Sequence, residues 1–285
     1  MMKHRARGED ALPSLAALRR RGAPIVMITA YDYPAGRIAE QAGADVVLVG
    51  DSAAMTVLGY SSTREVSVDE LLVLTRAVRR AVRNIPVVGD LPFGSYEGSD
   101  ELAVASARRF VDEAGCDAVK LEGAGDMVAR VRAIIDAGIP VVGHVGLLPQ
   151  SVTSPDGYRA RGREVDQALA IVADASALEV AGCAAVVVEA VPSEIGTLIA
   201  ERLTVPVIGI GAGAATDGQV LVYHDLLGYG EGRAAKFVRR YADAHEEFVG
   251  AVRRWGADVR NRSFPAVEEG YRIDSAVLDA VKRKL

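Results

Sequence analysis

Short apolar runs rich in valine and isoleucine recur along the chain, and longer polar segments with helical periodicity separate them. The runs do not alternate between polar and apolar positions, so both faces of each predicted strand should be buried, as in a parallel sheet covered by helices. The pattern predicts eight strands: Ile25–Thr29, Asp45–Val49, Pro86–Leu91, Ala118–Leu121, Pro140–His144, Ala184–Glu189, Pro206–Ile210 and Val220–Tyr223.

The segments between these strands have the periodicity of crossover helices. Ser67 and Glu70 frame one of them as a capping box, in which each side chain satisfies a backbone amide at the helix start. Several segments end in Ala-Gly and run directly into the next strand, and glycine there supplies the left-handed residue that ends a helix. The predicted helices include Val68–Val78, Leu102–Ala114, Val128–Ala137 and Ala168–Ala181.

Eight strands with intervening helices predict a (β/α)8 barrel, and a doubly wound sheet is the alternative. Residues 1–24 lie before the repeat and form a helical N-terminal extension, with a helix expected over Leu12–Arg21. Residues 25–256 form the barrel, which is the predicted catalytic domain. Residues 257–285 form a C-terminal loop and a closing amphipathic helix over Asp274–Leu285.

Composition and charge restrict the functional class. Half of the 285 residues are apolar and a quarter are charged, which excludes a disordered chain. The formal net charge of −5 is unfavourable for general binding of nucleic acid or anionic membranes. Cys116 and Cys183 lie far apart and outside any metal-ligand spacing, and the apolar runs are far shorter than the roughly 20 residues of a membrane span. We therefore expect a cytoplasmic protein.

Ionisable residues stand where the apolar strands end. In barrels of this architecture, the carboxyl ends of the strands surround a common mouth where chemistry occurs. Asp51, Asp90 and Glu122 follow three consecutive strands. Three carboxylates without a His or Cys cluster suit a hard divalent ion, most of all Mg²⁺. The alternative is that each is a helix cap or a surface loop residue, but burying so many charges favours a bound cation.

Further polar residues close the same strands. Lys120 lies two residues before Glu122 and faces the same side, where it can neutralise a substrate carboxylate or enolate, or pair with an aspartate. Glu189 ends an apolar run, and such surroundings suit a general base or acid; a helix cap is the alternative. We expect His144 to form hydrogen bonds beside the metal ligands rather than to catalyse.

Two strand ends contain other signals. The segment 211–213, Gly-Ala-Gly, stands at the end of the seventh predicted strand and is typical of a phosphate-binding loop, although glycines there also allow close loop packing. The eighth predicted strand ends in His224 and Asp225.

The residues at these strand ends carry a family resemblance. Val49-Gly50-Asp51-Ser52, continuing to Gly59, resembles the opening signature of the ketopantoate hydroxymethyltransferases, the 3-methyl-2-oxobutanoate hydroxymethyltransferases. Further segments match in order and with compatible spacing between Pro24 and Tyr241: Ile28–Asp32, Asp90–Phe93, Val119–Gly123, Gly143–Ser151, Glu189–Pro192, Ile208–Gly213 and Asp217–Gln219.

The resemblance implies a (β/α)8 barrel that binds Mg²⁺ and transfers a one-carbon unit from 5,10-methylenetetrahydrofolate to 3-methyl-2-oxobutanoate. The product is 2-dehydropantoate, on the route to pantothenate. It further implies that Asp51 and Asp90 are metal and substrate ligands, with Glu122 in or near the metal site. Ser52 and Lys120 contact the substrate carboxylate or keto oxygen, and Glu189 accepts the proton. A homo-oligomer of high order, such as a decamer, is also implied.

Two other functions compete with this interpretation. One is a Mg²⁺-dependent lyase or mutase similar to the phosphoenolpyruvate mutase and isocitrate lyase superfamily. The lyases of that superfamily carry a Lys-Lys-Cys-Gly-His loop, which this sequence lacks. The other is a barrel that binds without catalysing, which predicts the loss of charged strand ends, and here they are intact.

Overall fold

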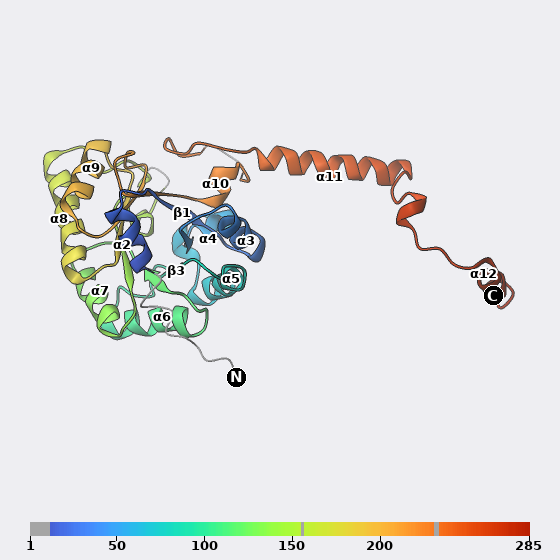
Figure 1. Ribbon diagram of the computed structural model, residues 1–285, viewed down its shortest axis with the longest axis horizontal. Coiled ribbons are helices and arrows are strands. Elements are labelled where there is room, and N and C mark those ends of the chain that lie inside the picture. Colours follow the sequence, from blue (N-terminus) through green and yellow to red (C-terminus); the bar gives the residue numbers. More distant parts are fainter. Residues whose placement is uncertain (1–11, 155–156, 231–233) are drawn as a thin grey trace.

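The computed structural model describes residues 12–154, 157–230 and 234–285, and in it eight parallel strands close into a barrel in chain order (Figure 1). The predicted (β/α)8 barrel is thus confirmed. The doubly wound sheet is excluded, because β1 pairs with β8 and leaves no open edge. The strands are β1 (Ile25–Thr29), β2 (Val46–Val49), β3 (Val87–Asp90), β4 (Ala118–Lys120), β5 (Val141–Gly146), β6 (Ala185–Glu189), β7 (Val207–Ile210) and β8 (Gly218–Leu221).

Helices connect the strands on the outside of the barrel. The capping box at Ser67 and Glu70 is present and begins α5, as the sequence predicts. The four predicted crossover helices correspond to α5–α8, with ends shifted by a few residues. The helices are α2 (Pro13–Arg20), α3 (Tyr33–Gln41), α4 (Ala53–Thr56), α5 (Val68–Ala81), α6 (Asp100–Asp112), α7 (Met127–Asp136), α8 (Val165–Ala181), α9 (Ser193–Arg202), α10 (Tyr223–Leu227), α11 (Ala244–Asn261) and α12 (Ser275–Lys282).

The eighth strand lies earlier than the sequence predicts. β8 begins at Gly218 and ends at Leu221, whereas Tyr223 already starts α10. Gly218 pairs with Ile25, and a side chain at this glycine would collide with the Ile25 carbonyl oxygen. The sequence around Gly218 is polar and therefore gives no sign that the backbone pairs closely with β1 here. His224 and Asp225 therefore lie on a short helix after the strand rather than at the strand end.

The N-terminal helix closes the floor of the barrel. Leu12 and Leu15 belong to the apolar cluster that fills the barrel interior, together with residues such as Ile25 and Val46. Arg19 of α2 holds this position, because its guanidinium donates to Asp217 at 2.8 Å and to backbone carbonyls at the end of α9 and in the loop that follows. The predicted N-terminal helix is confirmed, while residues 1–11 of the extension lie outside the described residues.

The barrel wall is covered unevenly. Residues of β2–β4 and β7 are buried throughout, and β5 and β6 are buried except at their last residue. In contrast, β1 and β8 alternate between buried and partly exposed residues, and Val26 is 52% exposed. Going around the barrel, β8 and β1 lie between the positions of α9 and α3. Of the described helices that follow β8, only the five-residue α10 lies at the barrel. We call this uncovered β8–β1 face the seam.

The C-terminal helices leave the barrel instead of covering the seam. α11 projects away from the barrel, and α12 lies beyond it (Figure 1). Neither helix has a buried residue. The predicted C-terminal helix corresponds to α12, and the division of the chain at residues 24 and 256 stays a prediction. Across the described residues, no helix has both the length and the apolar character needed to cross a membrane.

Candidate active site

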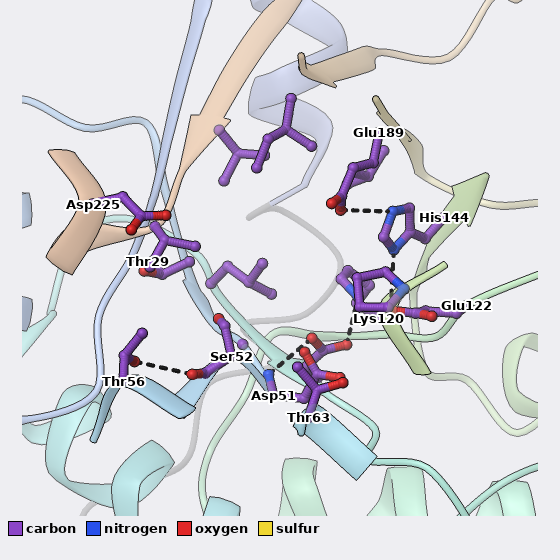
Figure 2. Close-up of a pocket in the computed structure, with 18 of the residues that line it drawn as sticks. Thr29, Asp51, Ser52, Thr56, Thr63, Lys120, Glu122, His144, Glu189 and Asp225 are labelled. Carbon is purple, nitrogen blue, oxygen red and sulfur yellow. Dashed lines mark hydrogen bonds and ion pairs between the residues drawn. The ribbon is translucent and has the colours of Figure 1, made fainter. Parts of the chain in front are cut away.

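The polar strand ends converge on one cavity at the carboxyl ends of the strands (Figure 2). The cavity has a volume of about 270 Å³, close to the lower end of the roughly 300–1,000 Å³ typical of small-molecule sites. All the residues predicted to bind or react line it: Asp51, Ser52, Asp90, Lys120, Glu122, His144 and Glu189. Sequence reasoning therefore placed these side chains together correctly, while their roles stay predictions.

Lys120 and Asp90 form a buried ion pair on neighbouring strands. β3 and β4 set Asp90 opposite Lys120, and Nζ of Lys120 lies 2.7 Å from Oδ1 of Asp90. Burial lowers the pKa of Lys120, but Asp90, Glu122 and Asp51 together raise it above its usual value. The lysine is therefore held as a cation, so it can neutralise an anionic ligand in a place that water does not reach.

Asp51 carries an electrostatic strain that a cation would relieve. Its backbone amide donates to Oδ2 of Asp90 at 3.1 Å, which holds the two aspartates together. Burial, followed by the charges of Asp90 and Glu122, raises the pKa of Asp51 well above its usual range. Two of these three effects come from carboxylates, so the arrangement is unfavourable for three ionised acids and favourable for a bound positive charge.

Gln150 is the residue that sequence reasoning missed. Its side-chain amide donates to Oδ2 of Asp51 at 2.9 Å and to the Leu91 carbonyl at 3.0 Å, while its backbone amide donates to Oε2 of Glu122 at 3.0 Å. The Tyr96 hydroxyl donates to Oε1 of Gln150 at 2.6 Å. A short 3-10 turn, Pro149–Ser151, places it there. The sequence contained one signal for it, because Gln150 lies within the segment Gly143–Ser151 that carries the family resemblance, but no role was assigned to it.

His144 lies between two of the carboxylates. Nδ1 is 3.5 Å from Oε1 of Glu122, and Nε2 is 3.3 Å from Oε2 of Glu189. Burial and Lys120 lower the pKa of His144, but the two glutamates outweigh them and raise it to about 9. An imidazolium here links Glu122 on the lysine side of the cavity to Glu189 on the next strand but one, and orients both carboxylates.

The backbone around Glu189 is shaped to bring β5 and β6 together. Gly146 has φ +96°, and a side chain there would lie 2.3 Å from the Glu189 carbonyl oxygen, so only glycine fits. Ala190 adopts φ 49°, a left-handed conformation uncommon for a residue with a side chain. Such strain concentrates at functional sites, and here it directs Glu189 into the cavity at the end of an apolar strand.

Ser52 joins the other side of the cavity. Its hydroxyl lies 2.8 Å from the Tyr31 hydroxyl, which is buried. Burial raises the pKa of Tyr31 to about 12, so this phenol stays protonated and can donate to Ser52. The serine hydroxyl is then free to donate to a ligand in the cavity.

The glycine-rich loop after β7 does not form the phosphate cradle considered above. A side chain at Gly211 would lie 2.6 Å from the Phe237 ring, and one at Gly213 would lie 2.7 Å from Ser193. Protein side chains occupy the space where a phosphate would lie, so these glycines serve close loop packing. Phe237, held in this way, forms part of the cavity wall.

The donor set suits a hard divalent cation. Oδ1 of Asp90 and Oε1 of Glu122 are buried, and the groups nearest to them are themselves cationic: Lys120 at 2.7 Å and His144 at 3.5 Å. Four carboxyl groups line the cavity wall from β2 to β6 against one lysine and one histidine, which leaves excess negative charge. Oxygen donors of this kind fit Mg²⁺. In the described chain, no group of three His, Cys, Asp or Glu side chains is already arranged around a single metal position.

A closed (β/α)8 barrel with buried carboxylates and a lysine at its mouth defines an enzyme of the barrel class. The family model described as ketopantoate hydroxymethyltransferase matches residues 10–267. A 3-methyl-2-oxobutanoate hydroxymethyltransferase from Geobacillus kaustophilus is 51% identical over 248 residues, covering 87% of this chain and 89% of the relative. The same enzyme from Shouchella clausii is 49% identical, covering 89% and 91%. The chain belongs to the ketopantoate hydroxymethyltransferase family and is a transferase.

Solved structures with the same fold come from a different group of enzymes. Phosphonopyruvate hydrolase in complex with oxalate and Mg²⁺ has a TM-score of 0.58 at 16% identity, covering 96% of both chains. A 2,3-dimethylmalate lyase of the phosphoenolpyruvate mutase and isocitrate lyase superfamily has a TM-score of 0.57 at 15% identity, covering 95% of this chain and 94% of the lyase. At such identities the likeness shows a shared fold alone.

Proposed function

We propose that this enzyme transfers a hydroxymethyl group from 5,10-methylenetetrahydrofolate to 3-methyl-2-oxobutanoate in a Mg²⁺-dependent reaction, giving 2-dehydropantoate for pantothenate synthesis. The enzyme name of the relatives supports the keto acid as the acceptor. The observation that carries the proposal is the buried Lys120–Asp90 pair beside Asp51 and Glu122, at the mouth of the barrel. This arrangement combines a fixed cation with a carboxylate set suited to a metal.

Asp51 and Asp90 would hold the Mg²⁺, with Glu122 in or beside its ligand set. When bound there, the ion supplies Lewis acidity that polarises the keto group of the substrate. Lys120 and the Ser52 hydroxyl bind the carboxylate or keto oxygen of the keto acid. Lys120 also neutralises the negative charge that develops as the substrate becomes an enolate, and this charge is largest in the transition state.

Glu189 is the proposed base that removes the proton from C3 of the keto acid. Its carboxylate enters the cavity beside His144, at the end of an apolar strand, on a different strand from the carboxylates near Lys120. Glu189 takes the proton, the electron pair of the C–H bond becomes the enolate, and C3 then forms a bond to the methylene carbon of the folate. Both bonds from this carbon to folate nitrogens break, and water supplies the oxygen of the new hydroxyl group. The two nitrogens take up the proton from Glu189 and one proton from water, and tetrahydrofolate leaves.

The experiment that tests this function is an assay of methylenetetrahydrofolate consumption dependent on 3-methyl-2-oxobutanoate, with and without Mg²⁺ after chelation. We expect consumption with both substrates and the metal, and formation of 2-dehydropantoate. Phosphonopyruvate and 2,3-dimethylmalate serve as control substrates for the lyase and mutase alternative. Turnover of either control substrate without folate would contradict the proposal. The shared fold by itself does not favour that alternative, because at 15–16% identity it shows the architecture and not the reaction.

We further propose that the enzyme works as a homo-oligomer. α11 presents a continuous apolar stripe that stays exposed: Phe248, Val252, Trp255 and Val259. Within the described chain, only single rings lie against it, Tyr229 at Phe248 and Phe264 at Trp255. The spacing of three and four residues places the stripe on one helix face. The seam leaves Val26 exposed where a long helix would normally cover the barrel. α11 of a second copy fits this place in length and apolar character.

We propose that this enzyme acts in the cytoplasm and that its partners are small molecules. The cavity has the size of a small-molecule site, and the net charge of −5 disfavours partners such as nucleic acid or an anionic membrane.

A further inference from the structure

The cavity has two chemically different sides. The carboxylates, Lys120 and His144 occupy the arc from β2 to β6. Asp225 lies on the opposite side, beside Thr29 and away from Glu189 and His144 (Figure 2). The labelled side chain nearest Asp225 is Thr29, followed by Thr56 and Ser52, so hydroxyl groups rather than charges share this side of the cavity (Figure 2). A charged side chain in this setting invites the question of what it binds.

The Asp225 carboxylate lacks a partner in the described part of the chain. No hydrogen bond or ion pair joins it to another described residue, while the neighbouring Thr29 hydroxyl already accepts from the Tyr223 amide at 2.8 Å. Asp225 is half-buried; burial raises its pKa and Arg240 lowers it by less. Asp225 thus faces the cavity as a partly buried carboxylate whose oxygens are available to accept hydrogen bonds from a ligand.

The two substrates of the proposed function differ in what they can offer Asp225. The keto acid carries only acceptor oxygens, a negative charge and an apolar branch, so Asp225 would repel it. The reduced pterin ring of the folate carries a ring N–H and an adjacent amino group. These two donors lie side by side, and a carboxylate can accept both in the manner of an Arg–carboxylate pair.

We infer that Asp225 binds the pterin ring of the folate co-substrate through paired hydrogen bonds, on the side of the cavity beside Thr29. This inference rests on the proposed function, because it assumes that a reduced folate is the second substrate. It also divides the cavity: the keto acid lies on the lysine side, and the folate approaches from β8 and α10. The methylene carbon then lies between them.

The test is the variant Asp225→Asn, which keeps the side-chain shape and removes the charge and one acceptor. Tetrahydrofolate and 6-methyltetrahydropterin are titrated by isothermal calorimetry against the Mg²⁺-loaded enzyme. We expect the affinity for both ligands to fall by about 10-fold or more, since charge-assisted hydrogen bonds are among the strong ones. Glu201→Gln is the matched control; Glu201 lies exposed on α9, and its substitution should leave both affinities unchanged.

A second measurement on the same variants reports on the other side of the cavity. Hydrogen exchange at C3 of 3-methyl-2-oxobutanoate, without folate, should be unchanged within about two-fold in Asp225→Asn, which also shows that the variant is folded. Unchanged pterin affinity in the variant would overturn the inference, as would loss of tetrahydrofolate binding with normal tetrahydropterin binding. If the unaltered enzyme exchanges C3 but binds no reduced folate, the proposed function fails instead, and the inference falls with it.

Discussion

Two arcs of the same barrel differ inside and outside. The arc from β2 to β6 is covered by helices, and four carboxylates, Lys120 and His144 lie at the carboxyl ends of its strands. Most of these side chains are almost fully buried in the cavity wall. The arc of β8 and β1 has an uncovered outer face, and Asp225 is the acidic residue lining the cavity there. The rigid, covered arc can hold charges at fixed distances, which a proton transfer requires. The seam is free to make contacts between molecules.

The largest effect should come from the aspartates of the covered arc. Asp51→Asn and Asp90→Asn each remove a proposed metal ligand and keep the side-chain shape. We expect Mg²⁺-dependent activity to fall by about 10³-fold or more, since Lewis-acid stabilisation contributes several kcal/mol. Activity is assayed over a Mg²⁺ titration, with circular dichroism as the check on folding. Normal activity at ordinary Mg²⁺ concentration in either variant would exclude the metal assignment.

The next effect separates proton transfer from binding. Glu189→Gln removes the proposed base, so C3 exchange of 3-methyl-2-oxobutanoate without folate should fall by about 10²-fold or more. The keto acid dissociation constant, measured in parallel by calorimetry, should change little. If exchange continues at the normal rate while product formation drops, Glu189 acts after enolisation and another group is the base.

Lys120 distinguishes electrostatic from covalent catalysis on the same arc. Lys120→Ala should lower kcat and raise KM for the keto acid, because both transition-state and carboxylate neutralisation are lost. A Schiff base would be trapped by borohydride in the presence of substrate as a covalent adduct on Lys120. We expect mass spectrometry to find the lysine unmodified, because its Nζ is already paired with Asp90 at 2.7 Å. A reduced adduct on Lys120 would overturn the electrostatic role.

Gln150 should matter less than the residues it holds. Gln150→Leu removes the side-chain hydrogen bonds to Asp51 and Leu91 at similar volume, and residues that orient metal ligands typically change metal affinity by 10–100-fold. We expect the Mg²⁺ concentration for half-maximal activity to rise by roughly that factor, with kcat recovering at high Mg²⁺. Tyr96→Phe leaves the Gln150 bonds to Asp51 and Leu91 in place; it removes the bond to Oε1 and the bond that the tyrosine hydroxyl accepts from the Glu122 amide, and is the milder control. Equal effects of the two variants would show that Gln150 does not act through Asp51.

The smallest effect on chemistry should come from the seam and its proposed cover. Trp255→Asp interrupts the apolar stripe of α11 and should lower the molecular mass measured by light scattering. C3 exchange at the covered arc should persist. Ala257→Asp introduces the same charge on the opposite face of α11 and should leave the mass unchanged. A wild-type enzyme that is monomeric at all concentrations would contradict the oligomer proposal.

The sequence predicts the barrel well because its signals are local. Apolar runs, capping residues and helix-ending glycines each mark an element within a few residues, and the strand ends then place Asp51, Asp90, Lys120 and Glu189 around one mouth. The sequence does not predict features that depend on contacts between distant parts of the chain. β8 is misplaced because Gly218 is explained only by its contact with Ile25 across the sheet.

The missed parts of the site have the same cause. Gln150 becomes visible only when the 3-10 turn brings it to residues 28 and 99 positions away. The glycines of 211–213 pattern like a phosphate loop until Phe237 and Ser193 are seen against them. Spacing along the chain reports periodic local structure, whereas a contact between distant loops leaves no comparable period.

The closed floor of the barrel has a consequence for the timing of the reaction. Because Leu12 and Leu15 fill the bottom of the barrel, the described residues leave the cavity open at the strand ends. Lys120 and Asp90 are almost fully buried, whereas Asp225 is partly exposed and so lies nearer that opening. With the proposed binding places, the keto acid must bind before the folate, because the bound folate then closes the opening of the cavity. The product can then leave only after tetrahydrofolate has dissociated.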